Sequence, residues 1–233
     1  MVIVTIDGKK YSGKEVIVDS WTGHAHKEFI HYFTDEYDGA DKLLNKKKSW
    51  YDMVNTWFSS DTHFGHYNII QYVNRPFKSS EQMNQEIIRK WNERVKPGDT
   101  VFFLGDFCFK SGSGRGEGDP FKAQEYIKQL NGNIIFIKGN HDGNNGLNTK
   151  IKSILIEMGG MEIFLVHNPM DSNNFYKLNL VGHVHAEWKS RPDMKFGEKT
   201  ILINVGTDVW DFYPISFNQI LEEYEKYTKP KGL

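Results

Sequence analysis

Five short polar segments each follow an apolar run in this chain, and this pattern limits the folds that it can adopt. An apolar run that ends in Asp, Asn or His is typical of a buried strand that presents a side chain at its carboxyl end. These side chains bind transition metals through oxygen or imidazole nitrogen. The segments are Asp61-Thr62-His63, Gly105-Asp106, Gly139-Asn140-His141-Asp142, His167 and Gly182-His183-Val184-His185. Five such segments at one edge of a sheet system predict a site for two metal ions.

The composition is that of an ordinary globular protein, and it excludes some functions. The chain has 233 residues, of which 39% are hydrophobic, and a formal net charge of −1. This charge gives no overall positive field, which argues against long nucleic acid as a partner. No stretch approaches the roughly 18 apolar residues of a membrane span, and residues 2–6 are too short for the apolar part of a signal peptide. We therefore expect a cytoplasmic protein that does not bind membranes.

The first part of the chain differs from the rest. Residues 2–6 alternate like a strand, Asp7-Gly8-Lys9-Lys10 is a turn signal, and residues 15–18 resemble a second strand. A polar stretch without a clear period follows. We expect residues 1–52 to form an N-terminal extension packed on a main domain of residues 53–233.

Strands and helices alternate in the main domain, which predicts the α/β class. Residues 101–104 are continuously apolar, as expected of a strand covered on both faces. Ser79 or Ser80 can begin a helix, Asp119-Pro120 another that runs to Gly132, and Ser216 with Gln219 a third. Ligands of such folds bind at the carboxyl ends of the strands, where all five polar segments are predicted to lie.

The order of the polar segments resembles that of the calcineurin-like metallophosphoesterase superfamily, over roughly residues 53–220. Gly139-Asn140-His141-Asp142 and Gly182-His183-Val184-His185 are its most specific parts. Two further segments resemble a small bacterial and phage branch of the family: Asn74-Arg75-Pro76-Phe77 and Asn204-Val205-Gly206-Thr207-Asp208-Val209-Trp210. The resemblance implies a four-layer αββα sandwich, in which helices flank two facing mixed β-sheets.

The resemblance also implies a set of metal ligands. One divalent ion would be held by Asp61, His63, Asp106 and His185. The other would be held by Asp106, Asn140, His167 and His183, so that the Asp106 carboxylate bridges the two. Imidazole with carboxylate suits manganese, iron, zinc, nickel or cobalt, and we favour manganese. One position departs from the family, because Val166 precedes His167 where the family usually has glycine.

A phosphoesterase mechanism follows from this centre. Two metal ions lower the pKa of a bridging water, and the resulting hydroxide attacks phosphorus. His141 would donate a hydrogen bond or proton to the leaving oxygen, and Asp142 would orient the His141 ring. For contact with substrate the sequence offers His66, Arg75 and Arg115. Each has an alternative: packing for His66, a surface cap for Arg75, and a flexible rim loop around Arg115.

The leading hypothesis is therefore an enzyme that hydrolyses small phosphate esters, with nucleotides as a plausible class. A cyclic-nucleotide phosphodiesterase or a nuclease of the same fold is the nearest alternative. A non-catalytic protein-binding scaffold is a third, but every metal-ligand position is filled in this sequence. Monoester or diester preference, the native metal and the oligomeric state stay open.

Overall fold

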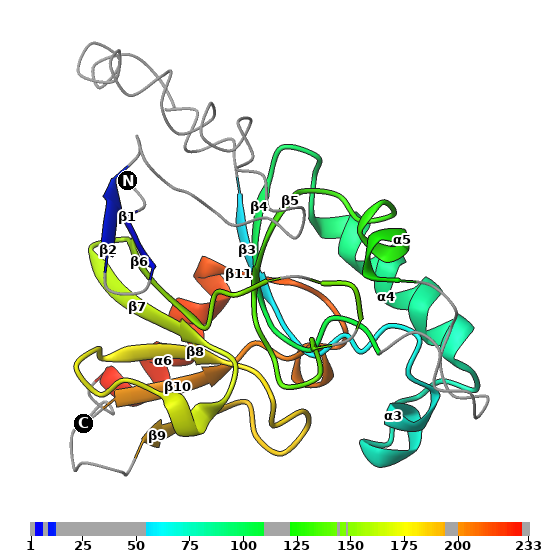
Figure 1. Cartoon of the computed structure of the whole chain (residues 1–233). Helices are drawn as coiled ribbons and strands as arrows, with labels where there is room; N and C mark the ends of the chain where they lie inside the picture. Colours follow the sequence, from blue (N-terminus) through cyan, green and yellow to red (C-terminus); the bar gives the residue numbers. More distant parts are fainter. Residues whose placement is uncertain are drawn as a thin grey trace.

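The computed structural model describes residues 3–6, 9–12, 55–109, 122–143, 145–147, 149–193 and 200–229. Two mixed β-sheets face each other (Figure 1). The larger has the order β2-β1-β6-β7-β8-β10-β9, with β1 Ile3–Ile6, β2 Lys9–Ser12, β6 Ser153–Met158, β7 Met161–Val166, β8 Leu178–Val181, β9 Ser190–Asp193 and β10 Thr200–Asn204. The smaller has the order β11-β3-β4-β5, with β3 Thr56–Ser59, β4 Thr100–Leu104, β5 Asn133–Ile137 and β11 Ile215–Ser216.

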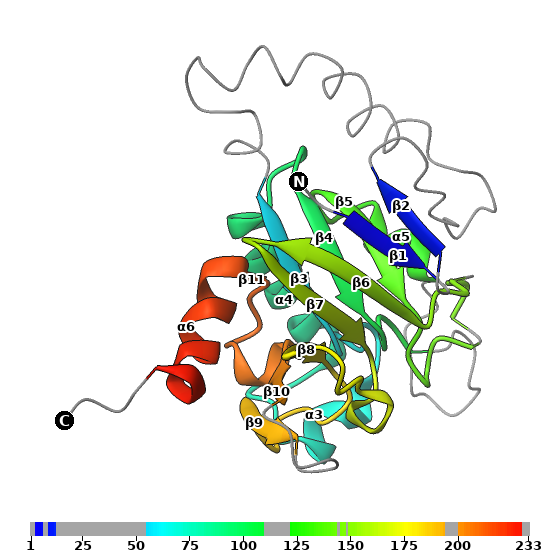
Figure 2. The ribbon, with the colours of Figure 1, turned by 90° about the vertical axis from the view of Figure 1, so that its left-hand side faces the viewer.

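Within the described residues the helices are α3 (Tyr67–Tyr72), α4 (Ser80–Arg94), α5 (Ala123–Ile127) and α6 (Phe217–Thr228), with short 3-10 helices η2 (Pro169–Asp171) and η3 (Thr207–Val209). Helices α4 and α5 cover the outer face of the smaller sheet (Figure 1). Figure 2 shows α6 beside β11 at one side of the sheets, and β1 with β2 at the other. The predicted class, two mixed sheets flanked by helices, is confirmed. None of the described helices combines the length and apolar character needed to cross a bilayer.

The core follows from side-chain alternation along the strands. In β4, Phe102 and Leu104 point into the layer between the two sheets, whereas Val101 and Phe103 pack with α4 and α5. All five residues of β4 are buried, as its continuous apolar run predicts. Ile203 in β10 joins the same inter-sheet layer. This layer holds the carboxyl ends of strands from both sheets at one edge, where the polar segments begin.

Helix starts agree with the sequence signals. The Ser79 hydroxyl accepts a hydrogen bond from the backbone N–H of Gln82 at the start of α4. Ser216 and Gln219 form the complete capping box of α6. Helix α5 ends at Ile127, earlier than predicted, and the predicted Asp119-Pro120 start lies outside the described residues.

The N-terminal segment extends the larger sheet. The predicted strand at residues 2–6 is confirmed as β1, which pairs antiparallel with β6. Lys9 and Lys10 of the predicted turn segment already pair with β1 as part of β2, and Asp7 and Gly8 lie outside the described residues. The predicted second strand at residues 15–18 lies outside the described residues. The boundary between residues 52 and 53 stays a prediction.

Candidate metal centre

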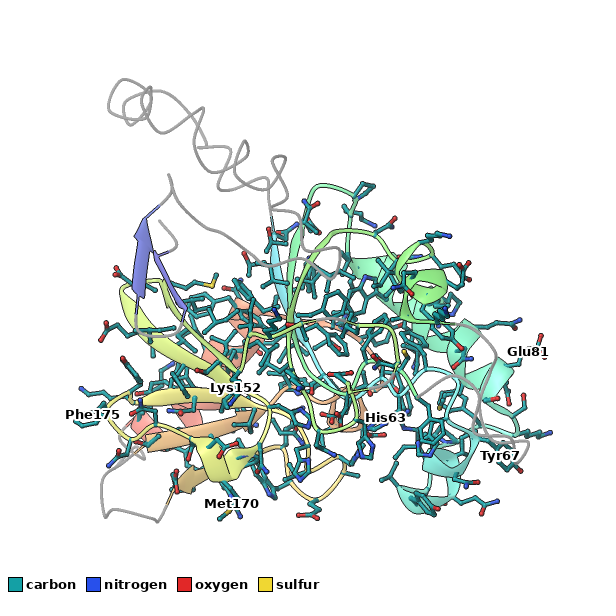
Figure 3. The ribbon with its side chains drawn as sticks, viewed as in Figure 1. His63, Tyr67, Glu81, Lys152, Met170 and Phe175 are labelled. Carbon is teal, nitrogen blue, oxygen red and sulfur yellow. The ribbon has the colours of Figure 1, made fainter. Side chains whose placement is uncertain are left out.

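The predicted strand tips converge on one edge of the two sheets. Asp61 follows β3, Asp106 follows β4 and Asn140 follows β5, and these three strands are parallel. His167 follows β7 and His183 follows β8, a second parallel pair. Figure 3 shows His63 at this lower rim, with Tyr67 of α3 on one side and Met170 of η2 on the other.

Backbone hydrogen bonds join the tips to one another. The N–H of Asp61 donates to the carbonyl of Gly105 at 3.0 Å, and that of His63 donates to the carbonyl of Asp106 at 3.1 Å. In the larger sheet the N–H of Gly182 donates to the carbonyl of His167 at 2.9 Å. The side chains are therefore held by the sheet framework rather than by free loops, which keeps their relative positions fixed.

Two groups of metal-type side chains result. The first group is Asp61, His63 and His185, and the second is Asp106, His167 and His183. In each group one ligand atom from every residue lies within 4.8 Å of the others. Within the residues that the structure describes, all seven predicted ligands are thus near one another, including Asn140. Its Oδ1 lies 2.9 Å from both His167 Nε2 and His183 Nδ1.

Asp106 lies between the two groups, as a bridging carboxylate would. Its Oδ2 is 3.6 Å from Nε2 of His63 in the first group and 3.3 Å from Nε2 of His167 in the second. Its other oxygen, Oδ1, accepts the backbone N–H of His141 at 2.8 Å. The structure brings these atoms together; their role as ligands stays a prediction.

His63 provides the test of whether a metal fits. The residue is buried, and neither of its ring nitrogens has a hydrogen-bond partner in the described part of the chain. Leaving a buried polar group unsatisfied costs about 1–3 kcal/mol. Burial, with the charge of Arg75 next, holds the pKa of His63 well below its usual value, so the ring is neutral and keeps a lone pair. A cation beside His63 would bind the ring nitrogen that carries the lone pair, and the imidazole, carboxylate and amide donors around it suit a divalent transition metal.

The backbone is strained at the same place. Asp61, His63, Asp106, His183 and His185 have φ values of 58°, 49°, 57°, 72° and 46°. Left-handed backbone at a residue other than glycine costs on the order of 1–3 kcal/mol and persists where the surroundings enforce it. Here it turns the chain sharply after each strand. Val166, by contrast, lies in the extended backbone of β7, so the departure from glycine before His167 creates no conflict.

Glycine is required by close approach rather than by φ at Gly182. A Cβ there would collide with Ser60 Oγ and with the carboxylate of Asp61. The glycine therefore lets the tip of β8 pass directly over the tip of β3. This explains in physical terms why the His-x-His segment begins with glycine.

Burial and neighbouring charges act in opposite directions on the pKa values of Asp106 and His167. Burial raises the pKa of Asp61 above its usual value. Burial alone would lower the pKa of His167, but its hydrogen bond with Asp106 and the charges of Asp61 and Asp106 outweigh it and raise the pKa to about 9. Burial would raise the pKa of Asp106, but His167 brings it below the usual range. In the metal-free protein a protonated His167 therefore offsets part of the negative charge.

His141 borders the two groups without joining them. Its side chain is 48% exposed, and its Nε2 lies 4.0 Å from Asp106 Oδ2. Its ring meets that of His63 edge-on at 5.3 Å between centroids. An imidazole that is open to solvent beside the centre has the position that a proton donor to a bound substrate needs.

The predicted role of Asp142 is wrong. Its carboxylate does not orient the His141 ring; it accepts the backbone N–H groups of Asp106, Phe107 and Gly139 at 2.9, 3.1 and 2.8 Å, and the amide of Asn145 at 2.8 Å. Asp142 therefore fastens the tip of β4 to the tip of β5. Asp142 has this role because the turn after β5 places its carboxylate beside the backbone N–H groups of Asp106 and Phe107, which are far away in sequence.

The prediction of substrate contact for Arg75 is also wrong. Its guanidinium binds the Asp208 carboxylate and the backbone carbonyls of Asp61 and Thr62, and the residue is only 4% exposed. His66 is buried too, and its ring stacks on that of Phe109 at 4.1 Å between centroids. Arg115 lies outside the described residues.

Asp208 is the site residue that the sequence reasoning missed. Its Oδ2 lies 2.9 Å from Nδ1 of His185, and both Arg75 and His185 help to hold the pKa of the Asp208 carboxyl low against the effect of burial. A signal existed, since Asp208 and Arg75 lie in the two segments that resemble a small bacterial and phage branch of the family. Their mutual contact, across 133 positions, could not be read from either segment.

The sequence model of the calcineurin-like phosphoesterase superfamily domain matches residues 55–212, the segment that carries every residue of the centre. The chain belongs to this superfamily. The chain is 38% identical to an uncharacterized protein of Methanocaldococcus jannaschii over 178 residues, which cover 75% of this chain and 93% of the relative. It is 35% identical to the Gene 66 protein of Mycobacterium phage L5 over 96 residues, 41% of this chain and 44% of the phage protein.

A solved structure shares the fold. The crystal structure of a protein of unknown function from Aquifex aeolicus superposes with a TM-score of 0.55 at 25% identity, covering 73% of this chain and 99% of that one. The superfamily indicates metal-dependent hydrolysis of phosphoesters, and the two groups of side chains are the candidate place for it in this chain.

Proposed function

We propose that this protein is a dinuclear metal-dependent hydrolase of small phosphate esters. The observation that carries the proposal is His63, a buried neutral imidazole with both nitrogens unpartnered among the described residues, at the point where two groups of metal-type side chains meet. Burial alone gives no reason to leave a lone pair of this ring unsatisfied, whereas a metal ion would bind it.

The chain's own residues divide the work as follows. Asp61, His63 and His185 would hold one ion, and Asn140, His167 and His183 the other, with Asp106 between them. When bound, two divalent ions supply a water of lowered pKa and positive charge for the phosphate oxygens. Manganese is our choice of ion, because its hard character suits the carboxylate and amide oxygens in this set.

His141 would protonate the leaving oxygen. Its half-exposed ring lies beside Asp106 and His63 without a close contact to either, so it is free to meet a substrate. The backbone N–H of His141 donates to Asp106 Oδ1, which fixes the segment that carries the ring. A positioned proton donor of this kind is worth about 10²–10⁴-fold in rate.

Nucleotides are the substrate class that one further observation favours. Tyr72 at the end of α3 is 71% exposed, and its ring lies 6.2 Å from that of His66, which is itself 5.7 Å from that of His63. An exposed aromatic ring this close to the centre can stack on a nucleobase. The near-neutral net charge argues against long DNA or RNA as the substrate.

A panel of substrates tests the proposal. The purified protein, reconstituted with Mn²⁺, would be assayed with p-nitrophenyl phosphate, bis-p-nitrophenyl phosphate, nucleoside monophosphates, cyclic nucleotides and single-stranded DNA. Hydrolysis of the small esters is expected. Selective hydrolysis of cyclic nucleotides or DNA would instead favour a phosphodiesterase or nuclease. A folded protein that takes up no metal would contradict the proposal and favour a protein-binding scaffold.

A further inference from the structure

Arg75 and Asp208 form a buried ion pair beside the first group of side chains. Arg75 Nε lies 2.7 Å from Asp208 Oδ1, and Nη2 lies 3.0 Å from Oδ2, so the contact is bidentate. The two side chains are 0% and 4% exposed. Arginine and a carboxylate in this fork geometry hold each other in a fixed orientation.

The same carboxylate reaches His185. Asp208 Oδ2 lies 2.9 Å from His185 Nδ1. A carboxylate at that distance places a proton on Nδ1, because the N–H donates and the oxygen accepts. The lone pair of a neutral His185 is then on Nε2. Partners of this kind set the tautomer and ring orientation of metal-binding histidines and raise their basicity.

Arg75 also holds the backbone of the first group. Its Nη2 donates to the carbonyl of Asp61 at 2.7 Å, and its Nη1 donates to the carbonyl of Thr62 at 2.8 Å. These carbonyls lie between Asp61 and His63, both of which have left-handed backbone. One arginine thus fixes all three members of the first group, two through the backbone and His185 through Asp208.

The second group has no such ion pair in the described part of the chain. There His167 Nδ1 lies 2.6 Å from the carbonyl of Leu104, a neutral acceptor. A buried ion pair rarely stabilises a fold more than apolar residues of similar size would, so stability alone does not explain Arg75 and Asp208. Because their charges cancel, Asp208 serves His185 as an acceptor without adding net charge.

We propose that Asp208, anchored by Arg75, is a positioning residue that presents His185 Nε2 to the metal ion of the first group. This inference rests on the proposed function, because it requires a metal at that group. By this inference, Asp208 and Arg75 strengthen the binding of the ion at the first group and leave the binding of the other ion unchanged.

The test is metal binding by the full-length Asp208→Asn variant. Wild type and variant would be stripped, reconstituted with Mn²⁺ and analysed by elemental mass spectrometry and calorimetric titration. Wild type is expected to bind two ions. Asp208→Asn is expected to bind one ion with unchanged affinity and the other about 10–100-fold more weakly, the usual effect of losing such a partner. Loss of the spin-coupled manganese signal would identify the change without an activity assay.

Two control variants separate positioning from general damage. Asp211→Asn alters an acid in the same segment whose side chain is 78% exposed and pairs with Lys90. Glu223→Gln alters a buried acid on α6, which forms an ion pair with Lys226 away from the centre. Both are expected to bind two ions with wild-type affinity. Glu223→Gln, like Asp208→Asn, removes a buried carboxylate. If Asp208→Asn lowered stability as Glu223→Gln does and still bound both ions, Asp208 would have a structural role only.

Each outcome is decisive. Two ions bound by Asp208→Asn with wild-type affinity would overturn the inference and leave the proposed function standing, whereas a wild type without metal would overturn both. If Asp208→Asn does not fold, nitrogen NMR of Zn²⁺-loaded wild type replaces it. A protonated Nδ1 and a metal-bound Nε2 at His185 are expected there, and a metal-bound Nδ1 would refute the assignment.

Discussion

The backbone N–H of His183 donates to the carboxylate of Asp61 at 2.9 Å, although the two residues are 122 positions apart. This bond joins the tip of β8 in the larger sheet to the tip of β3 in the smaller one. The Asp61 carboxylate also accepts the Ser60 hydroxyl at 2.6 Å. The Asp61 side chain of the first group thereby holds the backbone of His183 in the second group. The positions of the two groups are therefore coupled.

Asp106→Ala is expected to abolish the binding of both ions. Its Oδ2 lies 3.6 Å from Nε2 of His63 in the first group and 3.3 Å from Nε2 of His167 in the second. Metal content after reconstitution measures the effect, and turnover should fall to background. Retention of both ions by this variant would contradict the bridging position of Asp106.

His141→Ala is expected to separate metal binding from turnover. Its ring lies 4.0 Å from Asp106 and is half exposed, so its removal should leave two ions bound. The turnover number should fall by about 10²–10⁴-fold, the usual worth of a positioned proton donor. The turnover number should fall less for esters with better leaving groups, because these leaving groups need less protonation. Wild-type turnover would refute the role.

Asp142→Asn is expected to lower stability through the backbone. The variant weakens the acceptor of three backbone N–H groups that join the tips of β4 and β5. We expect a loss of about 1–3 kcal/mol in the free energy of unfolding, which denaturant titration can measure. Asp171→Asn, at an exposed acid of η2, is the matched control and should leave stability unchanged. An unaltered midpoint for Asp142→Asn would contradict this fastening role.

Metal uptake is expected to release a proton from His167. In the metal-free protein burial would lower the pKa of His167, but Asp106 and Asp61 raise it to about 9, above the ordinary value of about 6.5. The proton therefore stabilises the metal-free fold fully below about pH 6.5, and this contribution is lost as the pH rises through about 9. Between these values an incoming ion must displace it, so metal affinity should fall as the pH falls.

Calorimetry in buffers of different ionisation enthalpy measures this release. At a pH between about 7 and about 8 the binding heat of Mn²⁺ should depend on the buffer with a slope near one proton. A heat that is independent of the buffer would show that His167 is already neutral.

Tyr72→Ala is expected to change substrate preference. Tyr72 is 71% exposed and its ring lies beside that of His66. If it stacks on a nucleobase, kcat/KM for a nucleoside monophosphate should fall by about 5–100-fold, the worth of one stacked base, whereas that for an alkyl phosphate should not change. Tyr72→Phe should retain the preference, since the ring remains. An equal loss with both substrates would exclude stacking.

The sequence by itself determined the side chains of the centre and the strands that carry them. The continuous apolar run of residues 101–104 predicts a strand that is covered on both faces, and capping residues such as Ser79 and Ser216 act within a few positions of the helix they begin. An apolar run is a pattern of adjacent residues, and a helix cap is an interaction between near neighbours in the chain. Both can therefore be predicted from the sequence alone.

Only the tertiary structure decided what the charged side chains bind. Asp142 serves backbone groups 35 and 36 positions away, and Arg75 is paired with Asp208 across 133 positions. The left-handed backbone of Asp61 is likewise held by a contact from another segment, since Arg75 donates to the carbonyl of Asp61. The physical reason is that a buried charge must find compensation wherever packing brings a partner, and that position is a property of the assembled sheets.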